Sequence, residues 1–446
     1  MTRYRRDPSW RQPGDGKVVI AGSPLRLFRL STGGAQVLDM ATTGEQPAAA
    51  AVDRLLDRFV EAGALHPLHD AGPFTASDVT VVIPVKGRVP SLSPWPATIV
   101  VDDGNEPALD VPDGVTTVRL AANLGPAAAR NAGLEHVATP LVAFVDADVE
   151  LGREWLEPLL RHFADPLVAL VAPRVAGADV PGPVAAFERR HSPLDLGPDP
   201  ARIAAGTRVA YVPAAALVCR TDVVRSLGGF DTALRVGEDV DLVWRLNEHG
   251  HRCRYEPSSV VHHRPRDTWV AMLRQRAGYG RSAAPLSRRH PGALAPARMS
   301  GWSAAVWALL AIRRPALALA VGGGTVIALG RKLRDLPAQE SARLVVLGHL
   351  AAGRQLAKGL TRVWWPIAGV AAIAVPRARL PIAAAVIGPA VADAVCRRST
   401  TPLRDAPALL ADELAYGAGV WRGVFEERTL APLAPSFTRR PTRGDD

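Results

Sequence analysis

Two aspartates follow a very apolar short segment of the chain and have the spacing of ligands for a divalent cation. Residues 141–145 read Leu-Val-Ala-Phe-Val, a run typical of a buried strand, and Asp146-Ala147-Asp148 comes directly after it. Carboxylates at positions i and i+2 repel each other unless a cation lies between them, and Mg²⁺ or Mn²⁺ facing a diphosphate prefers oxygen ligands. We expect Asp146 and Asp148 to hold such a cation and its diphosphate. The alternative is a solvated turn.

A second pair of carboxylates follows another apolar strand. Asp102-Asp103-Gly104-Asn105 comes directly after residues 98–101, and ligand sites of α/β proteins form at the carboxyl ends of parallel strands. Because Asp-Gly after a strand is also ordinary turn chemistry, a purely structural role is the alternative.

The segment NLGPAAARNAG, residues 123–133, predicts a helix that begins at its Gly-Pro pair. Arg130 has the planar guanidinium that suits a pyrophosphate, and a plain helix would not need the pair Arg130-Asn131 at this place. We therefore expect this helix to face the same ligand as Asp146 and Asp148.

A third acidic group, Glu238-Asp239, follows the loop motif GGFD and begins a helix. Acidic residues in the first turn also suit the helix dipole, so capping is the alternative role for Glu238. Asp241 and Arg245 stand four residues apart and are expected to form a helix-stabilising pair.

Two adjacent histidines, His262 and His263, follow the strand-like residues 259–261. We expect His262 to be a further metal or diphosphate contact, with an ordinary exposed histidine as the alternative.

The elements that must position these residues read as a parallel α/β sheet, because short apolar runs alternate with helical segments. The expected strands are residues 79–85, 98–101, 116–120, 141–145 and 168–172.

Residues 17–68 read as a separate small module with strands at 18–20 and 25–30, followed by helices. Its last helix has one apolar stripe that must pack on something, and Gly63 is expected to end it. The stripe consists of Val52, Leu55, Leu56, Phe59 and Val60. Residues 66–73 are expected to form a linker.

From residue 299 the chain becomes rich in Ala, Val, Leu and Trp, but its charge-free runs are shorter than the roughly 20 residues that a spanning helix needs. These runs are either buried core helices or re-entrant and interfacial helices. In the second case, which we favour, arginines would anchor them at anionic head groups, namely Arg313, Arg314, Arg377 and Arg379. The tail at 433–446 is expected to be disordered.

The net charge of +10 suits an anionic partner such as nucleotide phosphates, acidic lipids or nucleic acid. The cysteines Cys219, Cys253 and Cys396 form no CxxC pair, so neither a zinc cage nor a disulfide framework is indicated. No secretory signal pattern occurs at the N-terminus, and a cytoplasmic catalytic part is expected.

Taken in order, the motifs VVIPV, VDDGN, NLGPAAARNAG, FVDAD, GGFD and EDVDLVWRL resemble the family 2 glycosyltransferases over about residues 79–265. The resemblance implies a Rossmann-like GT-A domain that binds a nucleotide-sugar donor and a divalent cation. It implies that Asp239 is the general base, with Glu238 beside it, and that Asp102 and Asp103 contact the nucleoside. The residues that it implies for donor binding include Pro84, Arg130, Asn131 and Asp146. Those at the metal are Asp146, Asp148 and His262.

These implied roles agree with the chemistry of an inverting transfer. A sugar hydroxyl is a poor nucleophile, so a carboxylate must take its proton as it attacks the anomeric carbon. Cations must offset the charge that develops on the departing nucleoside diphosphate.

One departure from the family pattern concerns uracil recognition, since Lys86-Gly87-Arg88 stands where an acidic residue is frequent. The Gln-x-x-Arg-Trp motif of processive members is also missing.

The layout of the whole chain is similar to that of the mycofactocin-system glycosyltransferases: a PqqD-like winged-helix module at 1–70 for peptide or acceptor recognition, a transferase at 78–298, and an apolar helical, membrane-associated region at 299–432. This resemblance implies glucosylation of mycofactocin, a peptide-derived redox cofactor, from UDP-glucose into a short β-1,4-linked chain at the cytoplasmic face of the membrane.

Two other functions remain open from the sequence. A membrane-associated transferase of cell-envelope or lipid-linked glycans would suit the apolar region equally. A non-catalytic protein that binds peptide or DNA through the winged helix is the alternative of a different class, although residues 17–68 carry no stripe of Arg and Lys. We therefore expect no nucleic-acid partner.

Overall fold

The computed structural model describes residues 2–87, 97–398 and 400–437. The chain divides into two compact units: one comprises Gly16–Thr268 with the chain up to Gln12, and the other comprises Trp269–Asp446 with Pro13–Asp15. The expected boundary at residues 298/299 therefore falls inside the second unit, because α8 (Trp269–Arg281) and α9 (Ala283–Arg289) pack with the C-terminal helices.

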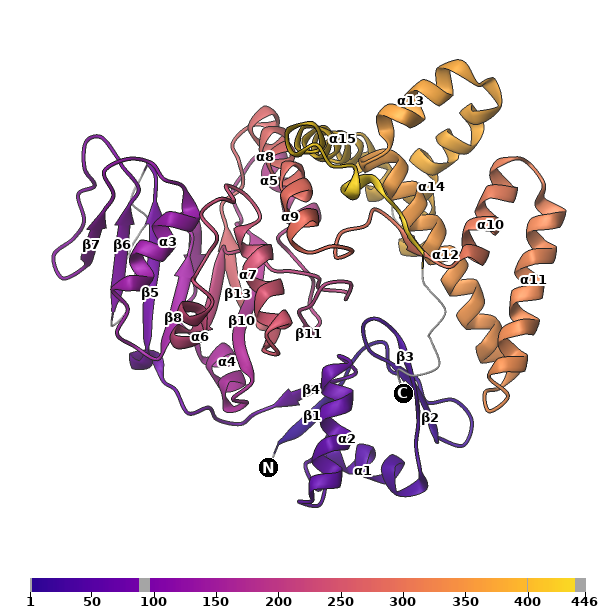
Figure 1. Cartoon of the computed structure of the whole chain (residues 1–446), viewed down its shortest axis with the longest axis horizontal. Coiled ribbons are helices and arrows are strands. Elements are labelled where there is room, and N and C mark those ends of the chain that lie inside the picture. Colours follow the sequence, from indigo (N-terminus) through magenta and orange to yellow (C-terminus); the bar gives the residue numbers. More distant parts are fainter. Residues whose placement is uncertain (1, 88–96, 399, 438–446) are drawn as a thin grey trace. The chain divides into compact units, whose positions relative to one another are not determined.

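The first unit begins with a small α+β module (Figure 1). Its elements are β1 (Arg3–Arg6), β2 (Val18–Ala21), β3 (Arg26–Arg29), α1 (Thr32–Thr43), α2 (Ala50–Glu61) and β4 (Leu65–Leu68). β2 and β3 form one antiparallel pair, and β1 and β4 form another. The expected strands and helices of this module are confirmed, while its assignment as a winged helix stays a prediction.

The apolar stripe of α2 packs into the core of the module, as its spacing predicts. Val52, Leu56, Phe59 and Val60 are buried, and the ring of Phe59 stacks on that of Phe28 at 4.1 Å between centroids. Burying each such side chain stabilises the fold by about 1.5–3 kcal/mol. The helix ends at Glu61, and Gly63 takes a φ of +66° immediately afterwards.

The linker expected at residues 66–73 begins later than the sequence indicates. Residues 65–68 form β4, which pairs with β1. His66 is buried, and its Nε2 lies 2.9 Å from Oδ2 of Asp7. The turn-forming composition concealed this strand because its partner is about 60 residues away in the sequence.

The transferase part is built on a nine-stranded sheet with the order β11-β13-β10-β12-β8-β5-β6-β7, and β9 pairs with β13. Its strands are β5 (Val79–Val85), β6 (Thr98–Asp102), β7 (Thr116–Arg119), β8 (Leu141–Val145), β9 (Val149–Leu151), β10 (Val168–Gly177), β11 (Ala201–Arg202), β12 (Ala216–Arg220) and β13 (Arg252–His263). The helical elements between them are η1 (Ala76–Asp78), α3 (Pro126–Glu135), α4 (Glu157–Leu160), η2 (Arg161–Ala164), α5 (Pro183–His191), α6 (Thr221–Ser226) and α7 (Glu238–Glu248).

The expected α/β fold is confirmed, but the sheet is mixed rather than parallel. β12 lies antiparallel between β8 and β10, and β9 and β11 are antiparallel to β13. Because β12 is antiparallel to both of its neighbours, β8 and β10 run in the same direction. β5, β6 and β13 run in this direction as well. The carboxyl ends of β5, β6, β8 and β13 therefore meet at one edge of the sheet.

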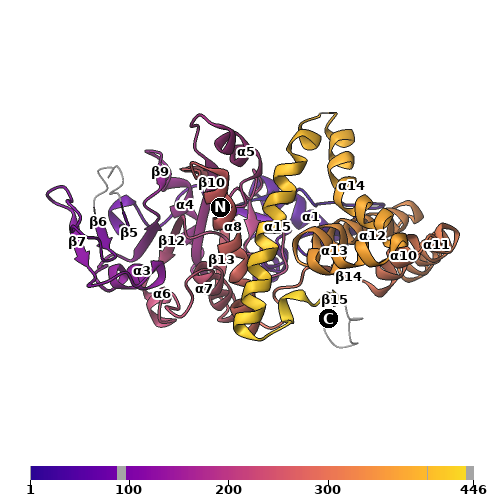
Figure 2. The same cartoon turned by 90° about the horizontal axis from the view of Figure 1, so that it is seen from above.

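The second unit is helical, as expected for the apolar region. Its further elements are β14 (Arg298–Met299), α10 (Gly301–Ala311), α11 (Pro315–Lys332), α12 (Ala338–Arg362), α13 (Trp365–Ala374), η3 (Pro376–Ala378), α14 (Arg379–Arg397), α15 (Thr401–Glu427), η4 (Ala431–Leu433) and β15 (Ser436–Phe437). Figure 2 shows α8 and α15 side by side. Gly419 permits this contact, because a Cβ there would lie 1.9 Å from the carbonyl oxygen of Ala277.

The expectation of a disordered tail is wrong for its first residues. Ser436 and Phe437 pair in parallel with Arg298 and Met299, and the indole nitrogen of Trp364 donates to the carbonyl oxygen of Leu433 at 2.8 Å. The remainder of the expected tail, residues 438–446, lies outside the described residues.

The alternative of buried core helices does not describe α14. Within the described residues, one helical segment, Pro376–Cys396, is by length and composition apolar enough to cross a membrane, and none of it is buried in the structure. The shorter apolar helices α10 and α13 fall below the length that a bilayer requires.

Candidate active site

Arg130 joins the ends of two elements at the carboxyl edge of the sheet. Its Nη2 donates to Oδ1 of Asp146, which follows β8, at 2.6 Å, and its Nη1 donates to Oε1 of Glu238, the first residue of α7, at 2.7 Å. The side chain of Arg130 is 3% exposed, and its guanidinium also lies over the ring of Phe230. Arginine in helix α3 thus connects two carboxylates that are about 90 residues apart.

The expectation that Arg130 and Asn131 contact the diphosphate stays a prediction, but the structure shows that both side chains already have partners within the protein. The guanidinium of Arg130 already serves two carboxylates, and the amide of Asn131 exchanges two hydrogen bonds with the backbone of Phe230, at 2.7 and 2.8 Å. A sequence cannot show which partner a buried arginine takes, because the partners come from distant segments. Both residues therefore help to position the site, and Nε of Arg130 is buried without a hydrogen-bond partner among the described residues.

Asp146 and Asp148 lie on the tight turn between β8 and β9, and both are about one third exposed. Oδ2 of Asp148 lies 3.4 Å from Nε2 of His263 and 3.3 Å from Nη2 of Arg266. Burial tends to raise the pKa of Asp148, but His263 and Arg266 outweigh it and hold the pKa below its ordinary value. Asp148 is therefore a partly exposed carboxyl group in its ionised form.

The structure replaces His262 by His263 as the histidine beside Asp148. His262 is exposed and stands opposite Glu150 in β9, whereas His263 is buried and stands opposite Val149. Successive side chains of a strand point to opposite faces, so a shift of one residue exchanges the two histidines. The metal contact expected of His262 stays a prediction, but the geometry favours His263 for that role.

Asp102 and Asp103 are almost fully buried; Asp102 is bonded within its own loop, whereas Asp103 is bonded to the segment directly before α3. The carboxylate of Asp102 accepts from the backbone and side-chain nitrogens of Asn105, at 2.8 and 2.7 Å. These bonds hold the pKa of Asp102 below its ordinary value although burial opposes them. These bonds give Asp102 a structural role at its Asp-Gly turn, and its expected contact with the nucleoside stays a prediction.

Asp103 determines where α3 begins. Its carboxylate accepts from the backbone nitrogens of Leu124 and Gly125 at 2.8 and 3.1 Å, directly before the first residue of α3. Gly104 makes this close approach possible, because it has a φ of +67° and a Cβ there would lie 2.4 Å from the carbonyl carbon of Ala122. Asp103 thereby fixes the helix that carries Arg130.

The end of β5 closes this loop on its other side. Pro84 pairs with Val101 within the sheet, and the carbonyl oxygen of Val85 accepts from the backbone nitrogen of Asp103 at 3.0 Å. Lys86 donates through Nζ to the carbonyl oxygen of Gly104 at 2.6 Å. Arg88, the third residue of the departure from the family pattern, lies outside the described residues.

Glu238 and Asp239 stand at the first turn of α7, where Gly237 takes a φ of +88°. Oδ2 of Asp239 accepts from the backbone nitrogen of Ala214 at 3.0 Å, and Oδ1 accepts from that of Val240 at 2.8 Å. Burial raises the pKa of Asp239. Burial and the adjacent Asp239 also raise the pKa of Glu238, to about 7, although Arg130 opposes this shift. Two neighbouring carboxyl groups with raised pKa values are suited to moving a proton near neutral pH.

The i,i+4 pair within α7 forms as its spacing predicts. Nε of Arg245 lies 2.7 Å from Oδ2 of Asp241. The other guanidinium nitrogens of Arg245 donate to the carbonyl oxygens of Leu227 and Gly229, at 2.9 and 2.7 Å. The pair therefore also anchors the GGFD turn that leads into α7.

The arrangement brings together most, but not all, of the expected residues. Asp146, Arg130 and Glu238 form one connected group with Asp239 adjacent, and Asp148 forms a second with His263 and Arg266. Among the described residues, no three His, Cys, Asp or Glu side chains are grouped as ligands for a metal ion. Sequence reasoning missed His263 and Arg266, and the strand-end position of His263 was the signal that could have suggested it.

Comparison with known proteins agrees with the resemblance of the motifs. Residues 97–220 match the model of glycosyl transferase family 2. The chain is 39% identical over 451 residues to proteins of Mycobacterium tuberculosis strains described as pre-mycofactocin glycosyltransferase, with 95% of either chain covered. Among solved structures it is similar to the mannosyltransferase PcManGT from Pyrobaculum calidifontis in complex with GDP-Man and Mn²⁺, with a TM-score of 0.42, 17% identity, and coverage of 87% of this chain and 98% of that chain.

Proposed function

Because the chain belongs to the pre-mycofactocin glycosyltransferases of glycosyltransferase family 2, we propose that it transfers glucose from UDP-glucose onto mycofactocin or its precursor and builds a short β-1,4-linked chain. The similarity that supports this proposal covers 95% of both chains, and therefore includes the N-terminal module and the helical region as well as the transferase. The contact that supports the chemistry is the link from Asp146 through Arg130 to Glu238, beside Asp239.

Asp239 is the general base of the proposed reaction. As the acceptor hydroxyl oxygen bonds to the anomeric carbon, its proton passes to the carboxylate of Asp239. The bond from the anomeric carbon to the nucleoside diphosphate breaks at the same time, and its electron pair stays on the phosphate oxygen. One such displacement inverts the anomeric centre and needs no covalent enzyme intermediate. The backbone nitrogens of Ala214 and Val240 hold the carboxylate in place.

Glu238 and Arg130 position the base. With its side chain 3% exposed, Arg130 ties Glu238 to the end of β8, so the first turn of α7 cannot move independently of Asp146. A fixed geometry speeds a transfer between two bound substrates, because the reactants then lose less entropy on reaching the transition state.

The divalent cation fits at Asp148 and His263. A half-exposed carboxylate 3.4 Å from an imidazole nitrogen offers two donors, and Mg²⁺ or Mn²⁺ typically takes its remaining ligands from substrate phosphates and water. When bound, the cation would offset negative charge on the departing diphosphate. Arg266, 3.3 Å from Asp148, adds a second positive charge at the same place.

The other parts of the chain have proposed roles in the same reaction. The N-terminal module would recognise the peptide-derived acceptor. The helical unit would associate with the cytoplasmic face of the cell membrane, which is supported by large apolar side chains that are more than half exposed, among them Leu319, Ile367, Val370, Ile373 and Leu380.

A donor screen with mass spectrometry tests the proposal. Purified protein is incubated with nucleotide sugars, with and without Mn²⁺ or Mg²⁺, and Asp239→Asn is compared with wild type and with the control Asp113→Asn, which removes an exposed carboxylate. We expect release of UDP that requires the cation, survives in the control and falls at least about 100-fold in Asp239→Asn. Undiminished turnover by Asp239→Asn would remove that residue from its role.

Acceptor identity separates the proposal from a transferase of cell-envelope or lipid-linked glycans. Deleting the encoding gene and analysing extracts by mass spectrometry should remove hexosylated forms of a small redox molecule and leave the envelope glycans unchanged. The reverse result would assign the enzyme to envelope glycans instead.

A further inference from the structure

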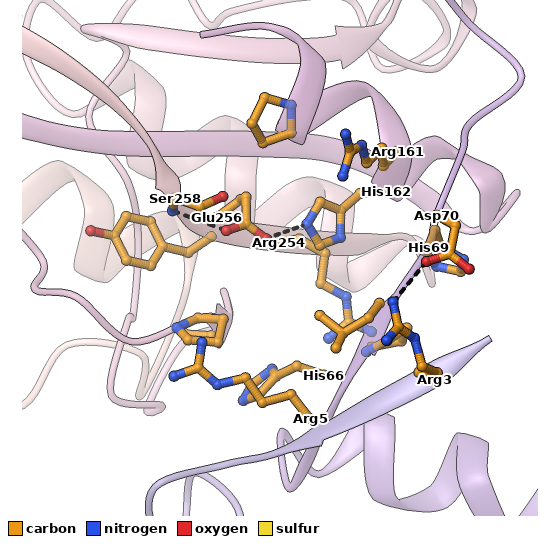
Figure 3. A pocket seen from close by; sticks show the side chains of 16 residues that line it. Arg3, Arg5, His66, His69, Asp70, Arg161, His162, Arg254, Glu256 and Ser258 are labelled. Atoms are coloured by element: carbon orange, nitrogen blue, oxygen red, sulfur yellow. Dashed lines mark hydrogen bonds and ion pairs between the residues drawn. The ribbon is translucent and has the colours of Figure 1, made fainter. Parts of the chain in front are cut away.

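A cavity of about 280 Å³ lies within the first unit, between the N-terminal module and the transferase part. The module contributes side chains from β1 and from β4 with the two residues that follow it, and the transferase part contributes side chains from η2 and β13 (Figure 3). We call it the module pocket. Its charged or basic lining residues are Arg3, Arg5, His66, His69, Asp70, Arg161, His162, Arg254 and Glu256.

Most charges in the module pocket are matched by a partner. Arg3 pairs with Asp70 at 2.9 Å, His162 pairs with Glu256 at 2.9 Å, and Arg161 pairs with Glu157. Burial lowers the pKa values of His66 and His69, so both rings are neutral at neutral pH. These groups form a polar wall but add little net charge.

Two arginines of the lining are exceptions in the described part of the chain: Arg5, which is exposed to solvent, and Arg254, which is buried. Within the described lining, only Arg254 lacks both solvent and an ion-pair partner. It is 3% exposed, and in the described part of the chain its Nη1 is buried with no hydrogen-bond partner and no acidic side chain forms an ion pair with it. The nearby carboxylates of Glu61 and Asp165 instead contact Arg252, at 2.5 and 2.7 Å. Burial lowers the pKa of Arg254 to about 10, which still leaves it positively charged. A buried cation without a counter-charge is costly, so an anion from outside the chain would stabilise it.

The size and lining of the module pocket indicate more than a bare ion. A cavity needs only about 10–15 Å³ of such volume to hold one water molecule, so 280 Å³ accommodates an anionic group with a small organic body attached. Apolar surface is provided for that body by Leu68, by the ring of Tyr255, and by the prolines Pro67, Pro158 and Pro200. The hydroxyl of Tyr255 donates to the carbonyl oxygen of Gly197 at 2.7 Å, which fixes the ring. One carboxylate would match the single unmatched buried charge.

We propose that the module pocket binds the terminal carboxylate of a short apolar peptide segment, with Arg254 as its counter-charge. This deepens, and rests on, the proposed role of the module in recognising a peptide-derived ligand. The site is separate from the transfer chemistry, since none of its lining residues belongs to the group around Arg130 and Asp148.

Calorimetric titration of the full chain with N-acetyl-alanyl-leucine tests the proposal, with the C-terminal amide of the same dipeptide and inorganic phosphate as separate probes. We expect the free acid to bind, and the amide to bind at least about tenfold more weakly because it lacks the charge. Arg254→Met should weaken binding of the free acid by at least about tenfold, and Arg254→Lys should retain part of it. The control Arg26→Met removes an exposed arginine of the same module and should bind as wild type does.

Thermal unfolding keeps the test valid for a poorly folding variant. Because Arg254→Met removes an unmatched buried charge, its Tm without ligand should not fall, while the ligand-dependent rise in Tm disappears. Equal binding of acid and amide, or phosphate binding as strong as that of the free acid and equally dependent on Arg254, would overturn the peptide-carboxylate site. UDP release is measured in parallel, so that a lost transferase activity is not confused with a lost binding site.

Discussion

At the scale of single residues, the site depends on the ion pairs of Arg130 and on two adjacent carboxyl groups with raised pKa values, those of Glu238 and Asp239. Arg130 is buried between Asp146 and Glu238, and removing Arg130 would leave both carboxylates without their counter-charge. Glu238 and Asp239 carry adjacent carboxyl groups that burial moves toward a higher pKa. The two residues that we propose for proton transfer are therefore sensitive to small changes in their surroundings.

The pH dependence of the reaction follows from the raised pKa of Asp239. A general base must be ionised, and a raised pKa means that the carboxylate takes up its proton at a higher pH than an ordinary aspartate does. Activity should therefore fall with decreasing pH along an acid limb whose midpoint lies above 3.8, the ordinary value. The measurement is kcat/KM for donor and acceptor between pH 4 and 9.

Glu238→Gln supplies the control for this prediction. The substitution removes a negative charge next to Asp239. It also removes one of the two carboxylates that compensate the positive charge of Arg130. Both changes favour the ionised form of Asp239. The midpoint of the acid limb should move to lower pH. A midpoint near 4 in the wild type, or an upward shift in the variant, would contradict the role of this pair.

His263 and His262 form a matched pair of test positions for the cation site. His263→Ala should raise the Mn²⁺ concentration needed for half-maximal UDP release by about tenfold or more, because it removes the imidazole beside Asp148. His262→Ala should leave it unchanged, since that side chain is exposed on the opposite face of the strand. Direct Mn²⁺ binding, followed by electron paramagnetic resonance, provides a second measurement. Equal effects of the two substitutions would rule out the assignment to His263.

At the scale of elements, the junction between α3 and α7 is the most constrained part of the site. Asn131 in α3 is bonded in both directions to the backbone of Phe230, and Arg245 in α7 holds the carbonyl oxygens of the preceding turn. Gly229 lies between these two anchors with a φ of +71°. The turn that leads into the catalytic helix is thus fixed from both helices.

Gly229→Ala should destabilise this junction, and Gly228→Ala is its matched control. Both glycines have a positive φ, but a Cβ at Gly229 would lie 2.3 Å from Oδ1 of Asn131, whereas nothing lies within 4 Å of a Cβ at Gly228. Gly228→Ala should lower the free energy of unfolding by about 1 kcal/mol, and Gly229→Ala by about 2–4 kcal/mol. Urea denaturation followed by tryptophan fluorescence measures both. Equal losses would mean that the contact with Asn131 can relax.

At the scale of the whole molecule, ion pairs hold the N-terminal module to the transferase part within the first unit. Arg252 of β13 contacts Asp57 and Glu61 of α2 and Asp165 of the transferase part, at 3.2, 2.5 and 2.7 Å. Arg202 adds a bond to the carbonyl oxygen of Glu61 at 2.6 Å, at the end of α2. These contacts hold the two parts together, and the module pocket, with Arg254 in its lining, lies between them.

The exposed apolar side chains of the helical unit lead to a prediction about membranes. Full-length protein should sediment with vesicles of phosphatidylcholine and phosphatidylglycerol, because Val370 and Ile373, 67% and 80% exposed, can enter the lipid interface. Replacing both by Asp should weaken the partition by about tenfold or more, given about 1.5–3 kcal/mol for each buried apolar side chain. Leu167→Asp removes an exposed leucine of the transferase part and should have no effect. Unchanged sedimentation of the double variant would contradict the proposal.

The sequence by itself determined the short-range features of this protein. The runs at 79–85 and 141–145 correspond to β5 and β8 without any shift, and the spacing of the apolar residues of α2 predicted its buried face. Strand ends followed by carboxylates placed Asp102, Asp103, Asp146 and Asp148 at one edge of the sheet. The order of the motifs was enough to indicate the family, which is confirmed by the identity over 95% of the chain. These features depend on neighbours within a few residues.

Only the tertiary structure decided which partner each functional side chain has. It reversed β12 within the sheet, gave Arg130 two carboxylate partners and placed His263 rather than His262 beside Asp148. It bonded Asp102 within its own loop and Asp103 to the segment before α3. It also left Arg254 without a counter-charge between two parts of the chain. Each of these outcomes depends on segments that are far apart in the sequence, where packing and the register of strand pairing, rather than local residue preferences, determine what lies beside what.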